Sequence, residues 1–341
     1  MRRKEAPFEN TTGPDAGKTS RDARRTERTI NYLRISVTDL CNYRCIYCMP
    51  SGRVRRLPHS EILSFEEIAT VVRAAVPLGI NKLRLTGGEP LVRKGVPKLV
   101  EMLARVPGIE EIYLTTNGSL LEKLALPLKR SGLTRINISL DSLRPDRYRE
   151  ITRGGDLEKL WRGIAAAEKA GFSPIKLNVV MIKGINDDEI EEIAALTFDR
   201  SYEIRFIEYM PLGPCDVSAQ FVHVPAEEIK RRLAKLGALM PLPKWNSSGP
   251  AERFQLQGAR GTLGFISAMS HNFCATCNRI RLTADGRLLS CLFSGQTVEV
   301  KSLLRSSAPP SRLKEAIQLA ISLKPAARAS TCRNFMNTIG G

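Results

Sequence analysis

Short runs of β-branched and other apolar residues alternate with amphipathic stretches between about residues 30 and 236. Such runs are typical of buried strands, and apolar residues spaced three and four apart are typical of helices. Six strands are predicted: Tyr32–Val37, Lys82–Thr86, Glu111–Thr116, Arg135–Asp141, Ile175–Met181 and Glu203–Met210. Each is followed by a predicted helix, in order Ser64–Pro77, Val96–Ala104, Leu120–Arg130, Leu157–Ala170, Asp188–Phe198 and Ala226–Leu236.

Six strand–helix units in series predict an α/β fold with parallel strands and right-handed crossovers. Eight units would close a full barrel, so six indicate a partial (β/α)6 barrel of the TIM type, with a doubly wound sheet as the alternative. In both folds ligands bind at the carboxyl ends of the strands. Ser64 followed by Glu67 indicates a capping box, and Asn186-Asp187-Asp188 indicates a second helix start.

The two ends of the chain differ from this pattern. Residues 1–29 are polar and predict a disordered basic arm; a transit peptide is the weaker alternative, because five acidic residues lie there. After residue 237, Pro, Ser and Gly mark a boundary before a smaller α+β region. Its predicted elements are Leu263–Met269, Arg279–Thr283, Arg287–Phe293 and a helix at Ser311–Leu323. We therefore expect an arm (1–29), a barrel (30–236) and a C-terminal domain (237–341).

The net charge of the chain indicates what kind of partner it binds. The 341 residues carry a net charge of +17, which indicates an anionic partner such as nucleic acid or a phosphorylated small molecule. Aromatic residues make up only 6%, and no nucleic-acid motif with interleaved aromatics is present. No apolar run approaches a membrane span and no signal peptide is visible. The eight cysteines are therefore expected to bind metal or clusters in reducing cytoplasm rather than to form disulfides.

The first cysteine set is Cys41, Cys45 and Cys48, three thiols within eight residues that follow the first predicted strand. Three thiolates do not complete a tetrahedral zinc site, but they hold an iron–sulfur cluster with one iron left open. A zinc knuckle completed by a distant ligand is the alternative. The spacing, with Tyr47 before the last cysteine, resembles the radical S-adenosylmethionine (SAM) superfamily. That resemblance implies a [4Fe–4S] cluster whose open iron binds SAM, with the aromatic ring packed on SAM.

A glycine turn, Thr86-Gly-Gly-Glu89-Pro90, ends the second predicted strand. Its two glycines let a ligand approach the backbone, and the Glu89 carboxylate offers an acceptor for an ammonium group. After such a cysteine loop, the turn resembles the superfamily's site for the SAM amino group. By the same resemblance the expected SAM contacts are Tyr47, Gly88, Glu89, Asn117, Ser139 and Met210.

The second cysteine set is Cys274, Cys277 and Cys291. Asp285-Gly286 is a strong hairpin signal, and folding about it carries Cys291 back to near Ile280, within reach of Cys277. Three thiols therefore converge again without a fourth ligand, which indicates a second cluster with an open iron. The alternative is a four-cysteine zinc ribbon completed by Cys215 or Cys332.

Cations lie beside the second cysteine set and on or near the barrel strands. Arg279 and Arg281 share one strand face, and the others on or near barrel strands are Arg34, Lys82, Arg84, Lys176 and Arg205. Buried cations need partners, and the structural alternative pairs them with Asp141, Glu203 and Glu208. Seven cations against three acids leave an excess, and arginine suits phosphate oxygens, so a triphosphate is expected.

Longer segments of residues 30–341 resemble one family, the GTP 3′,8-cyclases, which act first in molybdenum cofactor biosynthesis. The segments are Leu33–Asp39, Leu114–Gly118, Ile136–Asp141, Lys176–Asp187, Ile204–Met210, the second cysteine spacing with its two arginines, and Gly340-Gly341. Leu40 departs from the family, which usually has arginine before the first cysteine. Two other classes stay open: a peptide-modifying radical SAM enzyme with an auxiliary cluster, and a zinc-containing RNA-binding protein.

The resemblance implies conversion of GTP to (8S)-3′,8-cyclo-7,8-dihydroguanosine 5′-triphosphate through a 5′-deoxyadenosyl radical. It implies SAM and two [4Fe–4S] clusters as cofactors, guanine on the open iron of the second cluster, and a Gly-Gly tail that reaches the active site. The implied GTP contacts are Arg34, Arg84, Thr115, Lys176, Arg279, Ile280 and Arg281, of which Arg34, Arg279 and Arg281 are catalytic. The implied partners are an electron donor of flavodoxin or ferredoxin type and cyclic pyranopterin monophosphate synthase. Neither nucleic acid nor membrane is expected, and a homodimer is left open.

Overall fold

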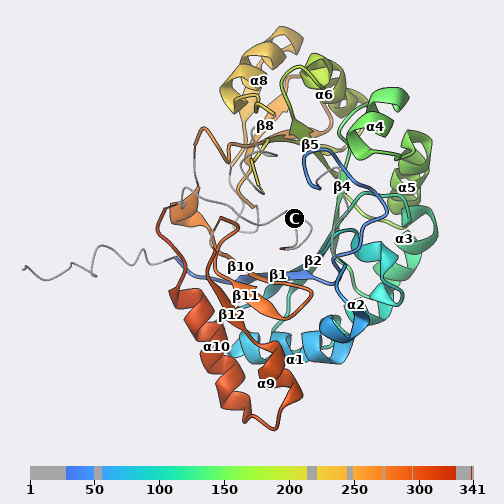
Figure 1. Ribbon diagram of the computed structural model, residues 1–341. Helices are drawn as coiled ribbons and strands as arrows, with labels where there is room; N and C mark the ends of the chain where they lie inside the picture. Colours follow the sequence, from blue (N-terminus) through green and yellow to red (C-terminus); the bar gives the residue numbers. More distant parts are fainter. Residues whose placement is uncertain are drawn as a thin grey trace, which may run out of the picture.

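Six parallel strands follow one another through the first part of the computed structural model, which describes residues 28–49, 56–212, 221–243, 249–271, 273–293, 295–327 and 339. They are β1 (Tyr32–Ser36), β2 (Lys82–Thr86), β3 (Glu111–Thr116), β4 (Arg135–Ser139), β5 (Lys176–Met181) and β6 (Glu203–Glu208). Each pairs in parallel with the next. The strands lie inside a ring of helices (Figure 1), as the sequence predicts.

The helices of this ring are α1 (Phe65–Ala75), α2 (Val96–Ala104), α3 (Leu121–Arg130), α4 (Pro145–Thr152), α5 (Leu157–Lys169), α6 (Ile190–Asp199) and α8 (Ala226–Leu233). All but α4 were expected from the sequence. The predicted capping box is present: the Ser64 hydroxyl accepts from the Glu67 amide at 3.1 Å, and the Glu67 carboxylate accepts from the Ser64 amide at 2.6 Å. It fixes the start of α1.

Helical structure begins at the second predicted helix start, but its first turn is a 3-10 turn, and α6 itself begins two residues after the predicted Asp188. A 3-10 turn spans Asp187–Glu189, and α6 begins at Ile190. The Asn186 side chain caps neither element, because it donates to the carbonyls of Asp141 at 2.8 Å and Val180 at 2.9 Å. Asparagine is a common helix-capping residue, but the side chain of Asn186 instead links the segment after β4 to β5.

Strands from the C-terminal part extend the same sheet at both edges. β9 (Thr262–Ile266) pairs in parallel with β6, and β10 (Arg279–Leu282) pairs in parallel with β1. The remaining elements are β7 (Leu239–Pro241), β8 (Glu252–Leu256), β11 (Arg287–Leu289), β12 (Thr297–Glu299), α9 (Lys301–Arg305) and α10 (Pro310–Ser322). The predicted boundary at residue 237 stays a prediction, since strands on both sides of it share one sheet.

The strand order within the described residues is β12-β11-β10-β1-β2-β3-β4-β5-β6-β9-β8-β7. From β1 to β6 it follows the sequence without the reversal that defines a doubly wound sheet. The partial barrel is therefore confirmed and the doubly wound alternative is wrong. Among the described residues no helix is both long and apolar enough to cross a membrane. The predicted basic arm and the Gly-Gly tail lie outside the described residues, except that residues 28 and 29 are described.

Alternation along the strands separates the core from the site. Leu33 and Ile35 of β1, with Leu83 of β2, are fully buried in the apolar layer between sheet and helices. Successive strand side chains point to opposite faces, so Arg34 and Arg84 point to the inside of the barrel, where both line a cavity. The outward-pointing apolar side chains of these strands pack in the core, and the inward-pointing polar side chains line the cavity.

Candidate active site

A cavity of about 340 Å³ lies inside the sheet, and both cysteine sets line it. Every expected SAM contact lines the same cavity: Tyr47, Gly88, Glu89, Asn117, Ser139 and Met210. So do the expected GTP contacts Arg34, Arg84, Thr115, Lys176, Arg279 and Arg281. Ile280 does not, because it alternates with its two arginine neighbours and is fully buried in the core. The structure thus brings together predicted site residues that are up to 257 positions apart, from Arg34 to Cys291.

The first cysteine loop is held by α4, an element that the sequence did not reveal. The amides of Arg44 and Ile46 donate to the carbonyls of Thr152 and Ile151, at 3.0 and 2.9 Å. Arg153, which follows α4 with a φ of +50°, donates from its guanidinium to the carbonyls of Arg44 and Met49. Within the loop, the Tyr43 amide donates to the Cys41 sulfur at 3.4 Å. These bonds fix the backbone that carries the three thiols.

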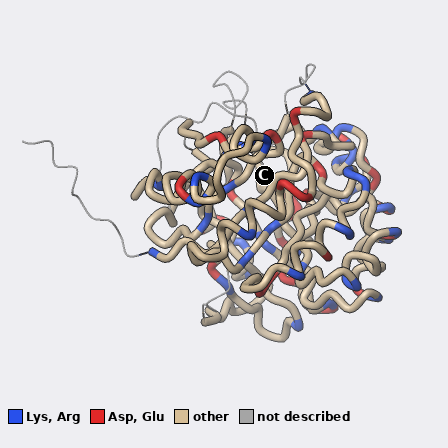
Figure 2. The backbone as a smooth tube through the Cα atoms, turned by 90° about the horizontal axis from the view of Figure 1, so that it is seen from below, with Lys and Arg blue, Asp and Glu red and all other residues tan. Residues whose placement is uncertain are grey.

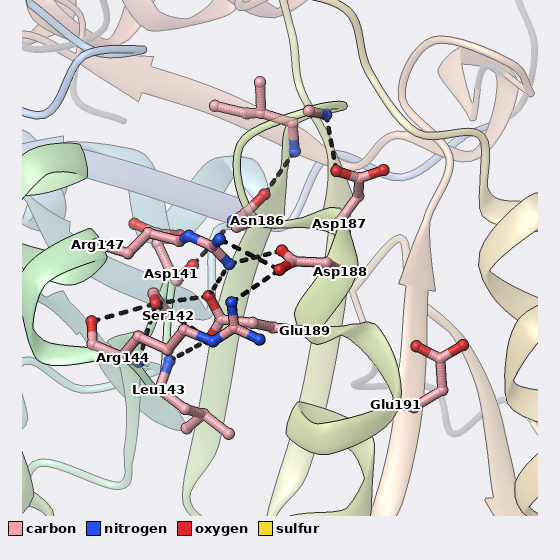
Figure 3. Close-up of polar contacts among 12 residues, drawn as sticks. Asp141, Ser142, Leu143, Arg144, Arg147, Asn186, Asp187, Asp188, Glu189 and Glu191 are labelled. Atoms are coloured by element: carbon pink, nitrogen blue, oxygen red, sulfur yellow. Dashed lines mark hydrogen bonds and ion pairs between the residues drawn. The ribbon is translucent and has the colours of Figure 1, made fainter.

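Tyr47 is tied to a buried polar network at the ends of β4 and β5. Its hydroxyl donates to Asp141 at 2.6 Å, and the other carboxylate oxygen accepts from the Val180 amide at 2.9 Å. Burial raises the pKa of Asp141 to about 6, although these two hydrogen bonds oppose the rise. Figure 3 shows the continuation of the network, in which Asn186 reaches the Asp141 backbone and Glu189 joins Ser142 to Arg147.

The two glycines of the turn make room for the protein's own chain. A Cβ added to Gly88 would lie 2.3 Å from the Leu40 carbonyl oxygen, and one added to Gly87 would lie 2.6 Å from that of Thr38. The segment before the first cysteine therefore packs directly on the turn, and the Glu89 amide donates to the Leu40 carbonyl at 2.8 Å. This close contact explains why glycine is required at both positions, in addition to the ligand approach that the sequence suggested.

Glu89 is a buried acceptor of internal hydrogen bonds. Its two oxygens accept from the Thr116 hydroxyl at 2.6 Å, the Leu91 amide at 3.1 Å and the Asn117 amide at 2.7 Å. Burial raises the pKa of Glu89 to about 7 against the effect of these bonds. The carboxylate thus shapes the end of β3 as well as the wall of the cavity.

Three arginines form a row across neighbouring strands. Arg281 of β10, Arg34 of β1 and Arg84 of β2 are direct partners in the sheet register. Burial, and then the charges of Arg281 and Arg84, hold the pKa of Arg34 well below its usual range. Arg84 donates to the Tyr32 hydroxyl at 2.5 Å and lies 5.0 Å above the Tyr113 ring. Like charges held this close favour a polyanion as their ligand.

Many other Lys and Arg residues lie away from the cavity. Lys and Arg residues are spread over the outer helices as well as the strands (Figure 2). Lys82, which the sequence grouped with the cavity cations, pairs with Glu111 at 3.2 Å and is not among the residues that line the cavity. The net positive charge therefore reflects the outer surface as well as the site.

Glu203 is the acid that pairs with cavity cations. It accepts from Lys176 at 3.0 Å and from Arg205 at 2.5 Å. Burial opposes its ionisation, but the charges of Arg205 and Lys176 outweigh burial and lower the pKa of Glu203 to about 2. Burial and the charge of Arg205 lower the pKa of Lys176 to about 7.

The other two expected acid partners do not fill that role. Asp141 binds Tyr47, and Glu208 accepts from the amides of Ala226 at 3.0 Å and Met269 at 2.7 Å. Both carboxylates accept from backbone amides and from hydroxyl groups that only the fold brings near them. The expected pairing is thus right for Glu203 and wrong for Asp141 and Glu208.

The second cysteine set lies on the predicted hairpin. β10 and β11 pair antiparallel with Arg281 opposite Leu289, which brings Cys291 back beside the start of β10. The Cys277 amide donates to the Cys274 carbonyl at 3.2 Å. Burial would raise the pKa of the Cys277 thiol, but the charges of Arg279 and Lys324 lower it. The register is within one residue of the sequence prediction.

Several residues of the site escaped sequence reasoning. Arg28 and Lys324 line the cavity beside the second cysteine set, and neither stands in a motif. Asn137 of β4 and Asn178 of β5 also line it, and their side-chain oxygens accept no hydrogen bond from the described residues. Two signals could have pointed to these asparagines: the alternation of polar positions along the two strands, and the segments Ile136–Asp141 and Lys176–Asp187 that carry the family resemblance.

The donor chemistry of both cysteine sets fits iron–sulfur clusters. All six cysteines are free thiols that line one cavity, and thiolates are the usual ligands of such clusters. Within the described residues no three His, Cys, Asp or Glu side chains are arranged to hold a single metal ion. Cys215 and Cys332, the expected fourth ligands of a zinc ribbon, lie outside the described residues.

Two family models match successive parts of the chain. The model of the Radical SAM superfamily matches residues 35–197, and the model named Molybdenum Cofactor Synthesis C matches residues 202–330. The first match implies a [4Fe–4S] cluster and SAM as cofactors. It runs from the end of β1 into α6 and includes the first cysteine set, and the second match includes the other cysteine set.

Solved structures support the fold. Streptococcus suis SuiB bound to precursor peptide SuiA matches with a TM-score of 0.60 at 15% identity, over 85% of this chain and 67% of that one. At this identity the likeness shows the fold alone.

Full-length relatives identify the family. A GTP 3′,8-cyclase of Pelotomaculum thermopropionicum is 53% identical over 300 residues, which cover 88% of this chain and 92% of the relative. A GTP 3′,8-cyclase of Thermodesulfovibrio yellowstonii is 50% identical over 318 residues, which cover 92% and 98%. Neither peptide modification nor RNA binding finds support in these relatives. The chain belongs to the GTP 3′,8-cyclase family of the radical SAM superfamily.

Proposed function

We propose that this chain converts GTP to (8S)-3′,8-cyclo-7,8-dihydroguanosine 5′-triphosphate with SAM, an early step of molybdenum cofactor biosynthesis. The observation that carries the proposal is the shared cavity: both cysteine sets and the row of Arg281, Arg34 and Arg84 line it. One cysteine set serves SAM and the other serves the substrate, so the two reactants meet in one enclosed space.

In this proposal Cys41, Cys45 and Cys48 hold the cluster that binds SAM. When bound, the cluster and SAM supply the radical that removes hydrogen from C3′ of GTP. The protein's part is to place SAM and exclude water: Tyr47, fixed by Asp141, packs on it, and other cavity residues supply hydrogen bonds. The residues proposed for those contacts are Gly88, Glu89, Asn117, Ser139 and Met210.

The second set would hold a further [4Fe–4S] cluster with an iron open to guanine. The triphosphate then lies against cations whose mutual repulsion it relieves, as the lowered pKa of Arg34 indicates. The residues proposed for GTP are Arg34, Arg84, Thr115, Lys176, Arg279 and Arg281. Ile280, fully buried, contributes through its backbone at most.

Arg34 holds the central place in the arginine row, between Arg281 and Arg84. We extend the proposal to a catalytic role for Arg34 after the C3′–C8 bond forms: the electron donor supplies one electron to the remaining substrate radical, and Arg34 takes part in this quenching at the active site. Arg279 and Arg281 hold the substrate beside it. The electron donor of flavodoxin or ferredoxin type, the downstream synthase and the cytoplasmic location stay predictions.

The test is anaerobic incubation of the reconstituted chain with GTP, SAM and dithionite, followed by chromatography and mass analysis. One hydrogen leaves C3′ and one electron and one proton are added later, so the product is an isomer of GTP. We expect a new peak with the mass of GTP and one 5′-deoxyadenosine for each product molecule. SAM cleavage that GTP does not stimulate would count against the proposal and favour another substrate.

Metal analysis distinguishes an iron–sulfur cluster at the second cysteine set from a zinc ribbon. We expect about eight irons in each wild-type chain, and about four after replacement of Cys274, Cys277 and Cys291 by Ser. That triple variant should still cleave some SAM but release no isomer of GTP. About four irons and one zinc in the wild-type chain would favour the zinc ribbon instead.

A further inference from the structure

Lys324 closes the open end of the hairpin that carries the second cysteine set. Its ammonium donates to the carbonyl of Arg279, at the start of β10, at 2.5 Å. It also donates to the carbonyl of Ser290, just past the end of β11, at 2.9 Å. β10 and β11 pair directly only at Arg281 with Leu289 and at the next pair toward the turn. The ammonium therefore joins the two strands where their own pairing has stopped.

The same ammonium lies beside the cysteines. Its charge acts on the thiols of Cys277 and Cys291. Cys277 lies two residues before Arg279, and Cys291 directly follows Ser290. One amine thus bonds to both strands, and its charge acts on two thiols of the set.

Arg28 anchors the backbone of Lys324. Its guanidinium donates to the carbonyls of Lys324 at 2.9 Å and of Pro325 at 2.7 Å, and to that of Cys274 at 2.6 Å. The third cysteine is therefore linked to the backbone of Lys324. Lys324 is half-buried. It directly follows Leu323, the C-cap of α10.

We propose that Lys324 is a positioning residue that fixes the second cysteine set and raises the reduction potential of its cluster. The inference rests on the cluster of the proposed function. Hydrogen bonds and positive charge near cluster sulfurs favour the reduced form, because reduction adds a negative charge. An uncharged donor bonded to the same two carbonyls would hold the hairpin equally well. It would not raise the reduction potential, because it brings no positive charge.

The experiment uses the full chain with Cys41, Cys45 and Cys48 replaced by Ser, so that only the second set binds iron. Three further variants are made in this background: Lys324→Met, Lys324→Arg, and Lys314→Met as a matched control on the exposed side of α10. Redox titration followed by electron paramagnetic resonance gives the midpoint potential, and iron analysis gives the cluster content. We expect Lys324→Met to lower the potential, and the other two variants to keep it near that of the background.

The outcomes separate this inference from the function on which it rests. A background chain without iron would overturn the second cluster and with it the proposed function. A background chain with about four irons, whose potential Lys324→Met leaves unchanged, would overturn the role of Lys324 alone. Iron lost from Lys324→Met and kept by Lys324→Arg supports the positioning role. Iron lost from both would overturn it, because arginine keeps the charge and the donors.

Discussion

The Tyr47 hydroxyl donates a hydrogen bond of 2.6 Å to Asp141, 94 positions further along the chain. This bond joins the first cysteine loop to the end of β4. The second oxygen of Asp141 accepts from the Val180 amide of β5, so the carboxylate is held from both sides. The ring proposed to pack on SAM is thereby fixed by the barrel itself rather than by its own loop.

Replacing Asp141 by Ala should impair both stability and SAM cleavage. It leaves the Tyr47 hydroxyl and the Val180 amide without their acceptor, which costs about 1–3 kcal/mol for a buried donor. Tyr47→Phe keeps the ring and removes one donor, so its effect on 5′-deoxyadenosine release should be smaller. Urea unfolding and product release measure the two effects. Unchanged SAM cleavage in Asp141→Ala would show that the Tyr47 ring does not need the hydrogen bond to Asp141 for its position.

Gly88→Ala should displace the segment before the first cysteine. The new Cβ would lie 2.3 Å from the Leu40 carbonyl oxygen, and backbone cannot move aside as a flexible side chain does. Overpacking of this kind costs about 1–3 kcal/mol. We expect lower stability and less iron at the first set, measured by urea unfolding and iron analysis.

Gly295→Ala is the matched control for this substitution. Nothing lies within 4 Å of a Cβ added at Gly295, and its backbone is not in the left-handed region. It should keep the stability and iron content of the wild-type chain. Equal behaviour of the two variants would mean that the turn and the cysteine loop do not depend on their close contact.

Local patterns were sufficient to predict most of the barrel and both cysteine sets. β2 and β3 have the predicted bounds, because their apolar runs end at polar turns. The six cysteines were found because their spacing is short. Nothing local marks the pairing of β1 with β10, whose partners Tyr32 and Arg279 are 247 positions apart. The C-terminal strands therefore looked like a separate region, although they complete the sheet.

Long side chains account for most of what was missed at the site. Arg28 reaches the Cys274 carbonyl across 246 positions, and Lys324 reaches Arg279 across 45. A single Arg or Lys in a chain with 52 of them carries no signal of its own. Their roles follow from the backbone carbonyls that they reach, and only the folded chain brings these carbonyls near them.

Glu203→Gln should destabilise the fold strongly. The carboxylate is shared by Lys176 and Arg205, and its removal leaves two buried cations without their counter-charge. Breaking a buried pair in this way costs about 3–5 kcal/mol. The folded pKa of about 2 lies below the ordinary 4.5, so this stabilisation is present above pH 4.5 and is lost as pH falls toward 2. Unfolding of wild type and variant should therefore differ at pH 7 and converge in acid.

Glu252→Gln is the control for a solvated ion pair. Glu252 pairs with Lys230 at 3.0 Å, but its side chain is 49% exposed. Its loss should cost about 0–1 kcal/mol. A similar loss for both variants would mean that the Glu203 pair is solvated in the folded chain.

Lys176 should make GTP binding sensitive to pH. Its folded pKa of about 7 lies below the ordinary 10.5, because burial and Arg205 disfavour the charged form. Only the ammonium attracts a triphosphate, so GTP affinity should fall as pH rises above 7, by at most about tenfold for each pH unit. Titration calorimetry between pH 7 and 9 measures this slope. Lys176→Arg, which stays charged, should flatten it, whereas Lys230→Arg, outside the cavity, should not.

The same shift predicts an opposite trend for stability. Between pH 7 and 10.5 the unfolded chain binds more protons than the folded chain, so the contribution of Lys176 to stability rises with pH. Its burial penalty disappears as the amine loses its charge. Urea midpoints of the wild-type chain should therefore rise relative to those of Lys176→Arg over the range in which GTP affinity falls. Parallel pH profiles of the two proteins, in binding or in stability, would show that Lys176 keeps its proton in the folded chain.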